Sequence, residues 1–432
     1  MNGIIEFLDR RFVPVAGKIG SQRHLVSIRD GFIAIMPIIM AGSLAVLLNN
    51  FPIPAFQNLM LSVFGESWRS LGGNIWNGTF AVMSLILVFT ISYSLGQSYE
   101  SDPLAAAVVG FTALMTITQS AAEAWAIPYT WTGAQGLFVT IIVAIVATEI
   151  FVKLRKNPKL VIKMPESVPP AVAKSFAALF PGLITIVIFA MIKIITTKVG
   201  ISNIHEAVFN VVQGPLSSLG QSLGSAIVVA FVGHFLWFFG LHGTNMLEPI
   251  MQGIYLPPLE ANIQAFQTMG VSAAQNIVTK PFFDVFVYMG GAGTSLGLII
   301  ALFISTKNKI FRQKAKLAVG PGLFNINEPV LFGMPIVLNP AYLIPFILVP
   351  VILTITSYVS IATGMVPKTV ALVPWTFPPI ISGYLVTGGS IRGALLQIIN
   401  LTISIAVYLP FIKVAERMDD KKLNEATKNE VY

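Results

Sequence analysis

Glu328 is a carboxylate in a largely apolar setting. It lies in the run FNINEPVLFG at residues 324–333, where it is the single charged side chain and follows two amides, Asn325 and Asn327. A carboxylate held among apolar residues can accept hydrogen bonds from hydroxyl groups and can act as a general base, and the amides can bind the same polar ligand. The alternative is a glutamate that ties the end of a broken helix to neighbouring backbone.

A second polar cluster follows a strongly apolar run and includes two of the four histidines of the chain. His242 is followed closely by Asn245 and Glu248, whereas His234 lies eight residues earlier. On a continuous helix the two histidines would be about 80° apart around the axis and two turns apart along it, so they need not share a site. We predict that His242, Asn245 and Glu248 face a polar cavity and that His234 packs in the interior.

Trp375 supplies an aromatic plane in the proline-rich run VPWTFPP. Carbohydrate sites join such a plane to carboxylates and amides, because one face of a sugar is apolar while its rim carries hydroxyl groups. Trp375 is therefore a candidate sugar-binding residue, and a tryptophan of the membrane–water interface is the alternative. We expect neither a metal nor a cofactor, since no pair of histidines or carboxylates has ligand spacing and the chain has no cysteine.

The composition excludes an ordinary soluble enzyme. Of the 432 residues, 55% are hydrophobic and 11% are charged, whereas soluble domains have roughly 45–50% apolar and about 25% charged residues. A membrane-spanning helix needs about 20 apolar residues. We therefore predict an all-α polytopic membrane protein with about ten transmembrane helices and additional re-entrant hairpins.

The apolar segments form a regular first group and a less regular second group. They lie at about 31–48, 76–96, 104–118, 134–152 and 176–197, and then at about 222–245, 285–306, 339–362 and 390–412. The stretches 248–284, 319–340 and 366–389 are interrupted by prolines and polar side chains. Irregular backbone at membrane depth survives only where protein encloses it or where it lines a cavity. We predict that these three stretches form the re-entrant hairpins of a binding site.

The excess of basic residues indicates orientation rather than binding of nucleic acid. There are 27 lysine and arginine residues against 19 acidic ones, a formal net charge of +8, and basic clusters lie at 153–174, 307–316 and 413–422. Because cytoplasmic loops carry the excess of lysine and arginine, these clusters are expected in the cytoplasm together with both termini. The predicted organisation is an amphipathic cytoplasmic N-terminus (1–30), an N-terminal transmembrane half (31–200) that contains the basic linker 153–174, a C-terminal half (201–413) and a cytoplasmic tail (414–432).

The run NINEPVLFG, continuing through Met334 to Pro340, resembles the motif of the membrane IIC component of the sugar phosphotransferase system, in its lactose, cellobiose and diacetylchitobiose branch. The N-terminal DRRFVPVAGKIGSQRHLVSIRDGF and the stretch around His242 agree with this resemblance. The length, without an attached soluble domain, agrees as well. The resemblance covers essentially the whole chain.

This resemblance implies a permease of the bacterial cell membrane that binds an extracellular disaccharide and carries it across. A soluble IIB protein, phosphorylated by IIA, would then transfer a phosphoryl group from its cysteine to the C6 hydroxyl of the sugar, with Glu328 and His242 close to that hydroxyl. The chain would thus be the membrane part of a phosphotransferase complex, and its missing cysteine fits a donor on a separate protein. The resemblance also implies a homodimer joined through the N-terminal half, with the C-terminal half binding the sugar. We expect IIB to dock near 307–316, and we favour diacetylchitobiose or cellobiose as the sugar.

Two other functions remain open from the residues alone. In an ion-coupled secondary transporter, Glu328 and His242 would form a proton relay and the sugar would emerge unmodified. A membrane-embedded hydrolase would need a second catalytic carboxylate, and none lies at a suggestive spacing.

Overall fold

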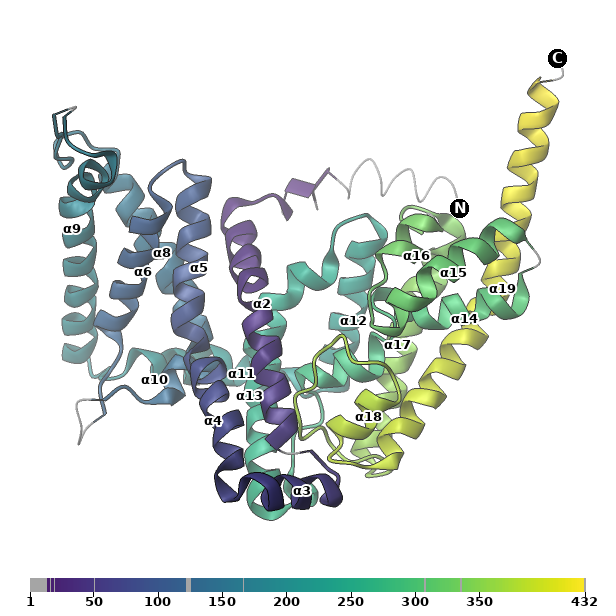
Figure 1. Cartoon of the computed structure of the whole chain (residues 1–432). Coiled ribbons are helices and arrows are strands. Elements are labelled where there is room, and N and C mark those ends of the chain that lie inside the picture. Colours follow the sequence, from purple (N-terminus) through teal and green to yellow (C-terminus); the bar gives the residue numbers. More distant parts are fainter. Residues whose placement is uncertain are drawn as a thin grey trace.

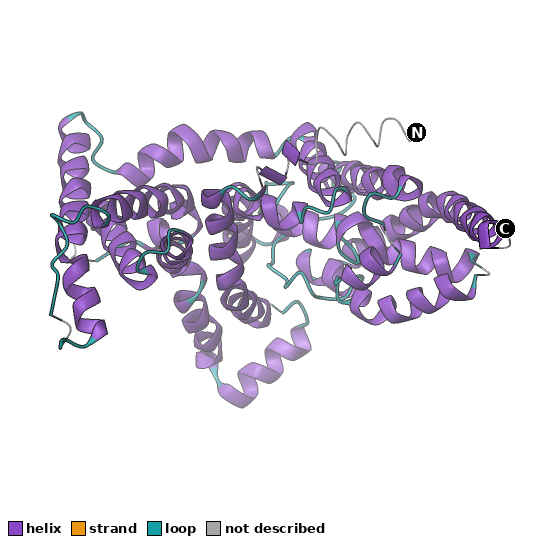
Figure 2. Ribbon diagram, turned by 90° about the horizontal axis from the view of Figure 1, so that it is seen from above, coloured by secondary structure: helices purple, strands orange, loops and turns teal. Residues whose placement is uncertain are grey.

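The computed structural model describes residues 14–430 except 16, 19, 50, 122–125, 166, 307 and 335, and of residues 340 and 418–430 it describes the backbone only. Every regular element in this part of the chain is helical (Figure 2). The first half of the expected amphipathic N-terminus lies outside the described residues.

The helices follow one another along the chain with short connections. They are α2 (Arg23–Asn49), α3 (Pro54–Phe64), α4 (Arg69–Gly78), α5 (Met83–Ser98), α6 (Pro103–Ile117), α7 (Tyr129–Thr132), α8 (Leu137–Arg155), α9 (Pro170–Lys198), α10 (Ile204–Val208), α11 (Gly214–Gly220), α12 (Leu223–Phe238), α13 (Gly243–Met269), α14 (Ser295–Ser305), α15 (Lys309–Leu323), α16 (Glu328–Gly333), α17 (Pro340–Ala362), α18 (Ile381–Val386) and α19 (Ile391–Glu430).

Several helix starts follow directly from local sequence. The side chain of Asp102 caps α6 by accepting a hydrogen bond from the Ala105 backbone N–H at 3.1 Å, and Pro103 occupies the first turn. The side chain of Asn339 caps α17 in the same way, and Pro340 follows it in the first turn. A polar cap followed by proline satisfies a free backbone donor and supplies a helical φ angle where no N–H is needed.

The all-helical membrane fold is confirmed, but the count of about ten spanning helices is not. Seven helical segments of the described residues are long and apolar enough to span a membrane, and the bent pair Ile204–Gly220 with Leu223–Phe238 makes eight if it counts as one span. The pair is bent by 89°. The predicted span at 104–118 corresponds to α6, which is apolar but has only 15 residues.

The stretch 248–284 is less broken than its sequence predicts. Helix α13 continues through Pro249, Pro257 and Pro258 as far as Met269. A proline removes one backbone hydrogen bond from a helix, and neighbouring helices can compensate within a protein-enclosed segment. About two thirds of the positions from Pro249 to Asn262 on α13 are buried. Two polar side chains of this segment, Gln252 and Asn262, are buried, and the irregular backbone begins only after residue 269.

Helices α2 and α13 pack against each other between two groups of helices (Figure 1). On one side lie α5, α6, α8 and α9, whose apolar side chains share a core with α2. On the other side lie α12 and α14–α19, and apolar side chains of α12, α14–α17 and α19 form a second core. The start of α2, the connection between α8 and α9 and the end of α19 lie at one end of the molecule, and α3 lies at the opposite end. Residues of α2 and α13 therefore face the space between the two groups.

Candidate functional site

A cavity of about 500 Å³ lies where α2, α12, α13 and α16 meet the proline-rich segment before α18. All seven residues predicted for the site line this cavity, although they come from three separate stretches of the chain: His242, Asn245, Glu248, Asn325, Asn327, Glu328 and Trp375. The fold thus brings them together, while their individual roles stay predictions. Among the described residues, no group of three histidine or carboxylate side chains could hold a metal ion.

His242 and Glu328 face each other across one wall of the cavity. His242 Nε2 lies 4.0 Å from Glu328 Oε1, and the two side chains are 40% and 48% exposed. His242 is in the turn between α12 and α13, whereas Glu328 is the first residue of α16. The separation is longer than the 2.7–3.2 Å of a usual N–H···O hydrogen bond. A small polar group can therefore bridge the imidazole and the carboxylate from one side, as a hydrogen-bond partner that both share.

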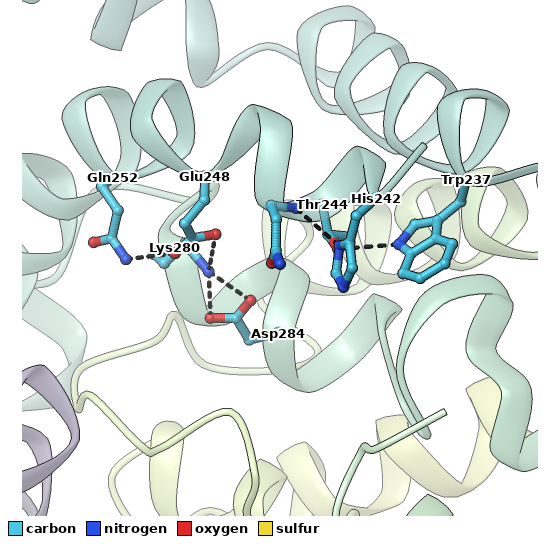
Figure 3. Close-up of polar contacts among 8 residues, drawn as sticks. Trp237, His242, Thr244, Glu248, Gln252, Lys280 and Asp284 are labelled. Atoms are coloured by element: carbon cyan, nitrogen blue, oxygen red, sulfur yellow. Dashed lines mark hydrogen bonds and ion pairs between the residues drawn. The ribbon is translucent and has the colours of Figure 1, made fainter. Parts of the chain in front are cut away.

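The imidazole of His242 is held in one orientation by its other nitrogen (Figure 3). Nδ1 accepts a hydrogen bond from the Asn245 backbone N–H at 3.4 Å and lies 3.2 Å from Thr244 Oγ1. The indole N–H of Trp237 donates to the same Thr244 oxygen at 3.1 Å, and the Trp237 and His242 rings are 4.1 Å apart between centroids. Because a backbone N–H can only donate, Nδ1 carries no proton and Nε2 presents its N–H to Glu328.

The protonation of His242 is shifted by its surroundings. This residue lies between helices, outside the segments that could span a membrane. Burial lowers the pKa of His242, and the neighbouring Glu328 carboxylate acts in the opposite direction. The net shift is downward, so the neutral imidazole is favoured.

Glu248 belongs to a charged cluster that the sequence did not predict (Figure 3). Lys280 Nζ lies 2.8 Å from both carboxylate oxygens of Asp284 and 3.3 Å from Glu248 Oε2. The Gln252 amide donates to Glu248 Oε1 at 2.5 Å. The side chains of Lys280 and Asp284 are 9% and 12% exposed, and that of Glu248 is 25% exposed. The i, i+4 spacing of Lys280 and Asp284 was the available sequence signal for this pair.

Asn325 joins three irregular segments through its side-chain amide. Its Oδ1 accepts from the Gly290 backbone N–H at 2.6 Å, and its Nδ2 donates to the carbonyl oxygens of Trp375 and Phe377 at 2.5 and 3.1 Å. Asn325 has a φ of 61°, a left-handed conformation that asparagine tolerates better than most residues. These bonds engage both amide hydrogens, so the geometry favours Asn325 as a positioning residue.

Asn327 and a glycine turn pack tightly beside Glu328. The Asn327 amide donates to the Ala292 carbonyl at 3.2 Å. Gly291 has a φ of 93°, and a Cβ atom added there would lie 2.7 Å from Asn327 Cγ. Only glycine fits both the backbone conformation and the space at this position.

The remaining candidates differ in how well the sequence located them. Trp375 is 36% exposed and lines the cavity. His234 is buried and packs edge-on against Tyr288, as predicted for an interior residue.

Sequence reasoning missed one face of α2, where Phe32, Met36, Ile39, Met40 and Ser43 line the cavity. This spacing is helical, but an apolar face of this kind looks the same whether it meets lipid, a core or a cavity.

Comparisons with known proteins agree along almost the whole chain. The family model "Phosphotransferase system, EIIC" matches residues 29–350. The chain is 39% identical to the lichenan permease IIC component of Bacillus subtilis, over 98% of this chain and 96% of that protein. It is 41% identical to the cellobiose-specific EIIC component of Geobacillus stearothermophilus, over 96% and 95% of the two chains.

A solved structure also matches almost the whole chain. It is the crystal structure of the transporter ChbC, the IIC component from the N,N'-diacetylchitobiose-specific phosphotransferase system. The TM-score is 0.90 at 40% identity, and the match covers 98% of this chain and 99% of that one.

Proposed function

This chain belongs to the EIIC family of the phosphotransferase system, and we propose on that premise that it carries a β-linked disaccharide across the bacterial cell membrane for phosphorylation by a IIB protein. The sugar would be held in the cavity with its C6 hydroxyl between His242 and Glu328. A phosphocysteine of IIB, itself phosphorylated by IIA, would supply the phosphoryl group. The 4.0 Å gap between His242 Nε2 and Glu328 Oε1 is the observation that carries the chemical part of this proposal.

The gap suits a hydroxyl group. An oxygen placed about 2.8 Å from both atoms would accept from Nε2–H of His242 and donate to Glu328 Oε1. Glu328 would then take the proton as the hydroxyl oxygen attacks phosphorus and the P–S bond breaks, so that the IIB cysteine leaves as a thiolate. His242 would fix the direction of attack. Phosphoryl transfer chiefly needs positioning and charge stabilisation, which these two side chains can provide together.

The lining and the relatives both support a disaccharide. A volume of about 500 Å³ lies within the range of roughly 300–1,000 Å³ of small-molecule sites. Trp375 offers an aromatic face, and Asn245, Asn327 and Glu248 offer polar groups along the same wall. Similar proteins are named for lichenan, cellobiose, oligo-beta-mannoside and N,N'-diacetylchitobiose. We favour cellobiose or diacetylchitobiose as the substrate of this chain.

The basic helix α15 is the proposed docking surface for IIB. Lys309, Arg312 and Lys316 are exposed on α15, and this helix leads within five residues to Glu328. Lys307, the first residue of the predicted cluster, lies outside the described residues. A donor protein bound there would be close to the hydroxyl it must reach. With α15 on the cytoplasmic side, both termini and the linker 153–174 would also lie in the cytoplasm. The proposed homodimer would form through the helices of residues 31–200.

The proposal can be tested with the full chain reconstituted in lipid vesicles. Labelled cellobiose and diacetylchitobiose are supplied outside, with and without phosphorylated IIB inside, and the internal sugar is analysed for phosphate. We expect sugar phosphate to accumulate only with phosphorylated IIB. Accumulation of unmodified sugar driven by a proton gradient would instead establish the ion-coupled transporter and refute the proposal.

Variants connect this result to the site. We expect Glu328→Gln and His242→Ala to weaken sugar binding and to lower phosphorylation by about 100-fold or more, as for loss of a general base. Glu206→Gln is a matched control, because Glu206 is exposed at the start of α10 and lines neither large cavity. Wild-type phosphorylation by Glu328→Gln would remove this carboxylate from the mechanism.

A further inference from the structure

A second cavity of about 500 Å³ lies beyond the site described above. Its walls come from α2, α4, α13 and the segment around α7. It holds aromatic rings together with amides and a carboxylate: Trp76, Tyr129, Asn49, Asn77, Gln135, Gln264, Gln267 and Glu260. No residue is shared between the linings of the two cavities.

The two cavities follow one another along the same two helices. On α2, Ser43 lines the first cavity and Val46 lines the second, about 4.5 Å further along the axis. On α13, Leu256 lines the first and Glu260 lines the second, about 6 Å apart. The second cavity thus lies towards the Asn49 end of α2, which in Figure 1 is the end near α3. The proposed orientation makes this the extracellular end.

A series of i, i+4 neighbours on α13 carries polar side chains into both cavities. Glu248, Gln252, Leu256, Glu260 and Gln264 are spaced four residues apart, so consecutive members adjoin and form a stripe that winds slowly around the helix. Leu256 is 2% exposed and is the one apolar member of this stripe. It separates the two polar members that face the first cavity from the two that face the second.

The chemistry of the second cavity matches that of the first. Trp76 and Tyr129 lie edge to face with centroids 6.5 Å apart, so two aromatic surfaces border one space. The Glu260 carboxylate has no hydrogen-bond or ion-pair partner among the described residues, although it is only partly exposed. A partly buried carboxylate without a partner is costly unless a ligand or water satisfies it. Several hydroxyl groups next to an apolar ring face would satisfy these amides, this carboxylate and the aromatic rings together.

We propose that this second cavity is an outer sugar-binding site, which captures the extracellular disaccharide before it passes Leu256 into the cavity of His242 and Glu328. This inference rests on the proposed function for the sugar and for the direction of transport. Tyr129 and Trp76 would stack on the rings of the sugar, and Glu260 would accept hydrogen bonds from its hydroxyl groups. Occupation of the outer site would raise the concentration of sugar next to the inner one.

Binding stoichiometry tests the proposal directly. Labelled cellobiose and diacetylchitobiose are equilibrated with the purified full chain in lipid nanodiscs, and binding is measured over a wide concentration range. We expect a second, weaker site per chain. Glu260→Gln should weaken that site about tenfold, the effect of losing a hydrogen bond to a charged group. Tyr129→Ala removes a stacking ring and should weaken the same site about threefold to tenfold. Both variants should leave the tighter site unchanged. Tyr129 is 53% exposed, so its truncation is compatible with folding.

Two controls separate this inference from the proposed function. Glu328→Gln should weaken the tighter site alone, and Thr268→Ala, an exposed position on α13 outside both cavities, should change neither. In sealed vesicles, Glu260→Gln should raise the KM for uptake while the rate at saturating sugar stays the same. Two results would overturn the outer site while leaving the proposed function intact. One is a single binding site in the wild-type chain. The other is a weaker site whose affinity in both Glu260→Gln and Tyr129→Ala equals that of the wild type. Absence of any sugar binding in the wild type would overturn both.

Discussion

Thr244 connects Trp237 to His242, and its hydroxyl is therefore a sensitive test of the proposed mechanism. Thr244→Val keeps the shape of the side chain and removes the oxygen that lies 3.1 Å from Trp237 Nε1 and 3.2 Å from His242 Nδ1. Trp237 is 4% exposed, so its indole N–H would lose its partner in a buried position. Such an unsatisfied donor costs about 1–3 kcal/mol.

The expected loss of phosphorylation rate comes from the hydrogen bond between Thr244 Oγ1 and His242 Nδ1. A neutral hydrogen bond contributes about 1 kcal/mol, and this amount changes a population ratio about fivefold. Without the Thr244 hydroxyl, Nδ1 of His242 keeps one hydrogen-bond partner, the Asn245 backbone N–H at 3.4 Å. We expect the rate of sugar phosphorylation by Thr244→Val to fall about fivefold to tenfold at saturating IIB.

The assay follows transfer of labelled phosphate from IIB to disaccharide in detergent solution. Thr244→Ser is the matched control, because it retains the hydroxyl and loses only a methyl group, and its rate should stay near that of the wild type. Equal loss in the serine and valine variants would mean that packing and not the hydrogen bond is important. A wild-type rate in Thr244→Val would refute the idea that this bond positions His242.

Three further predictions concern the charged cluster, the glycine turn and the docking helix. Lys280→Met leaves two carboxylates unpaired and should destabilise the chain by about 3–5 kcal/mol; an unchanged thermal unfolding midpoint in detergent would contradict the ion-pair geometry. Gly291→Ala places a Cβ atom 2.7 Å from Asn327 Cγ at a φ of 93°, so we expect a loss of about 1–3 kcal/mol in unfolding free energy and weaker sugar binding, both measurable on the purified chain. Arg312→Glu combined with Lys316→Glu should raise the KM for phosphorylated IIB at low salt and leave the sugar Kd unchanged, and an equal KM would argue against docking on α15.

Six of the seven candidate residues could be picked out from sequence because ionisable and amide groups are costly at membrane depth. Trp375 was picked out instead as an aromatic plane in a proline-rich run. Glu328 and His242 stood out against apolar neighbours, and the fold brings both to one cavity. The contribution of α2 could not be found in this way. Met36 and Ile39 have the same character as residues that face lipid or a helical core, and only the packing of α2 against α13 makes them cavity walls.

The extent of α13 shows a different limit of prediction from sequence. Pro249, Pro257 and Pro258 each weaken a helix locally, which predicted irregular backbone from residue 248 onwards. The tertiary environment overrides this preference, because enclosure by neighbouring helices stabilises α13 as far as Met269. Local sequence rules therefore located the polar segment correctly and misjudged its backbone.

The amide of Asn325 has a consequence for how the chain can vary. It connects the glycine turn at residue 290 with the backbone at residues 375 and 377, so three segments far apart in sequence share one set of hydrogen bonds. Loops usually tolerate insertions and deletions. Here, adding or removing one residue in any of the three segments would displace the other two, together with Glu328 and the Trp375 ring. Length changes should therefore be excluded from these turns, even though their sequences look like ordinary loops.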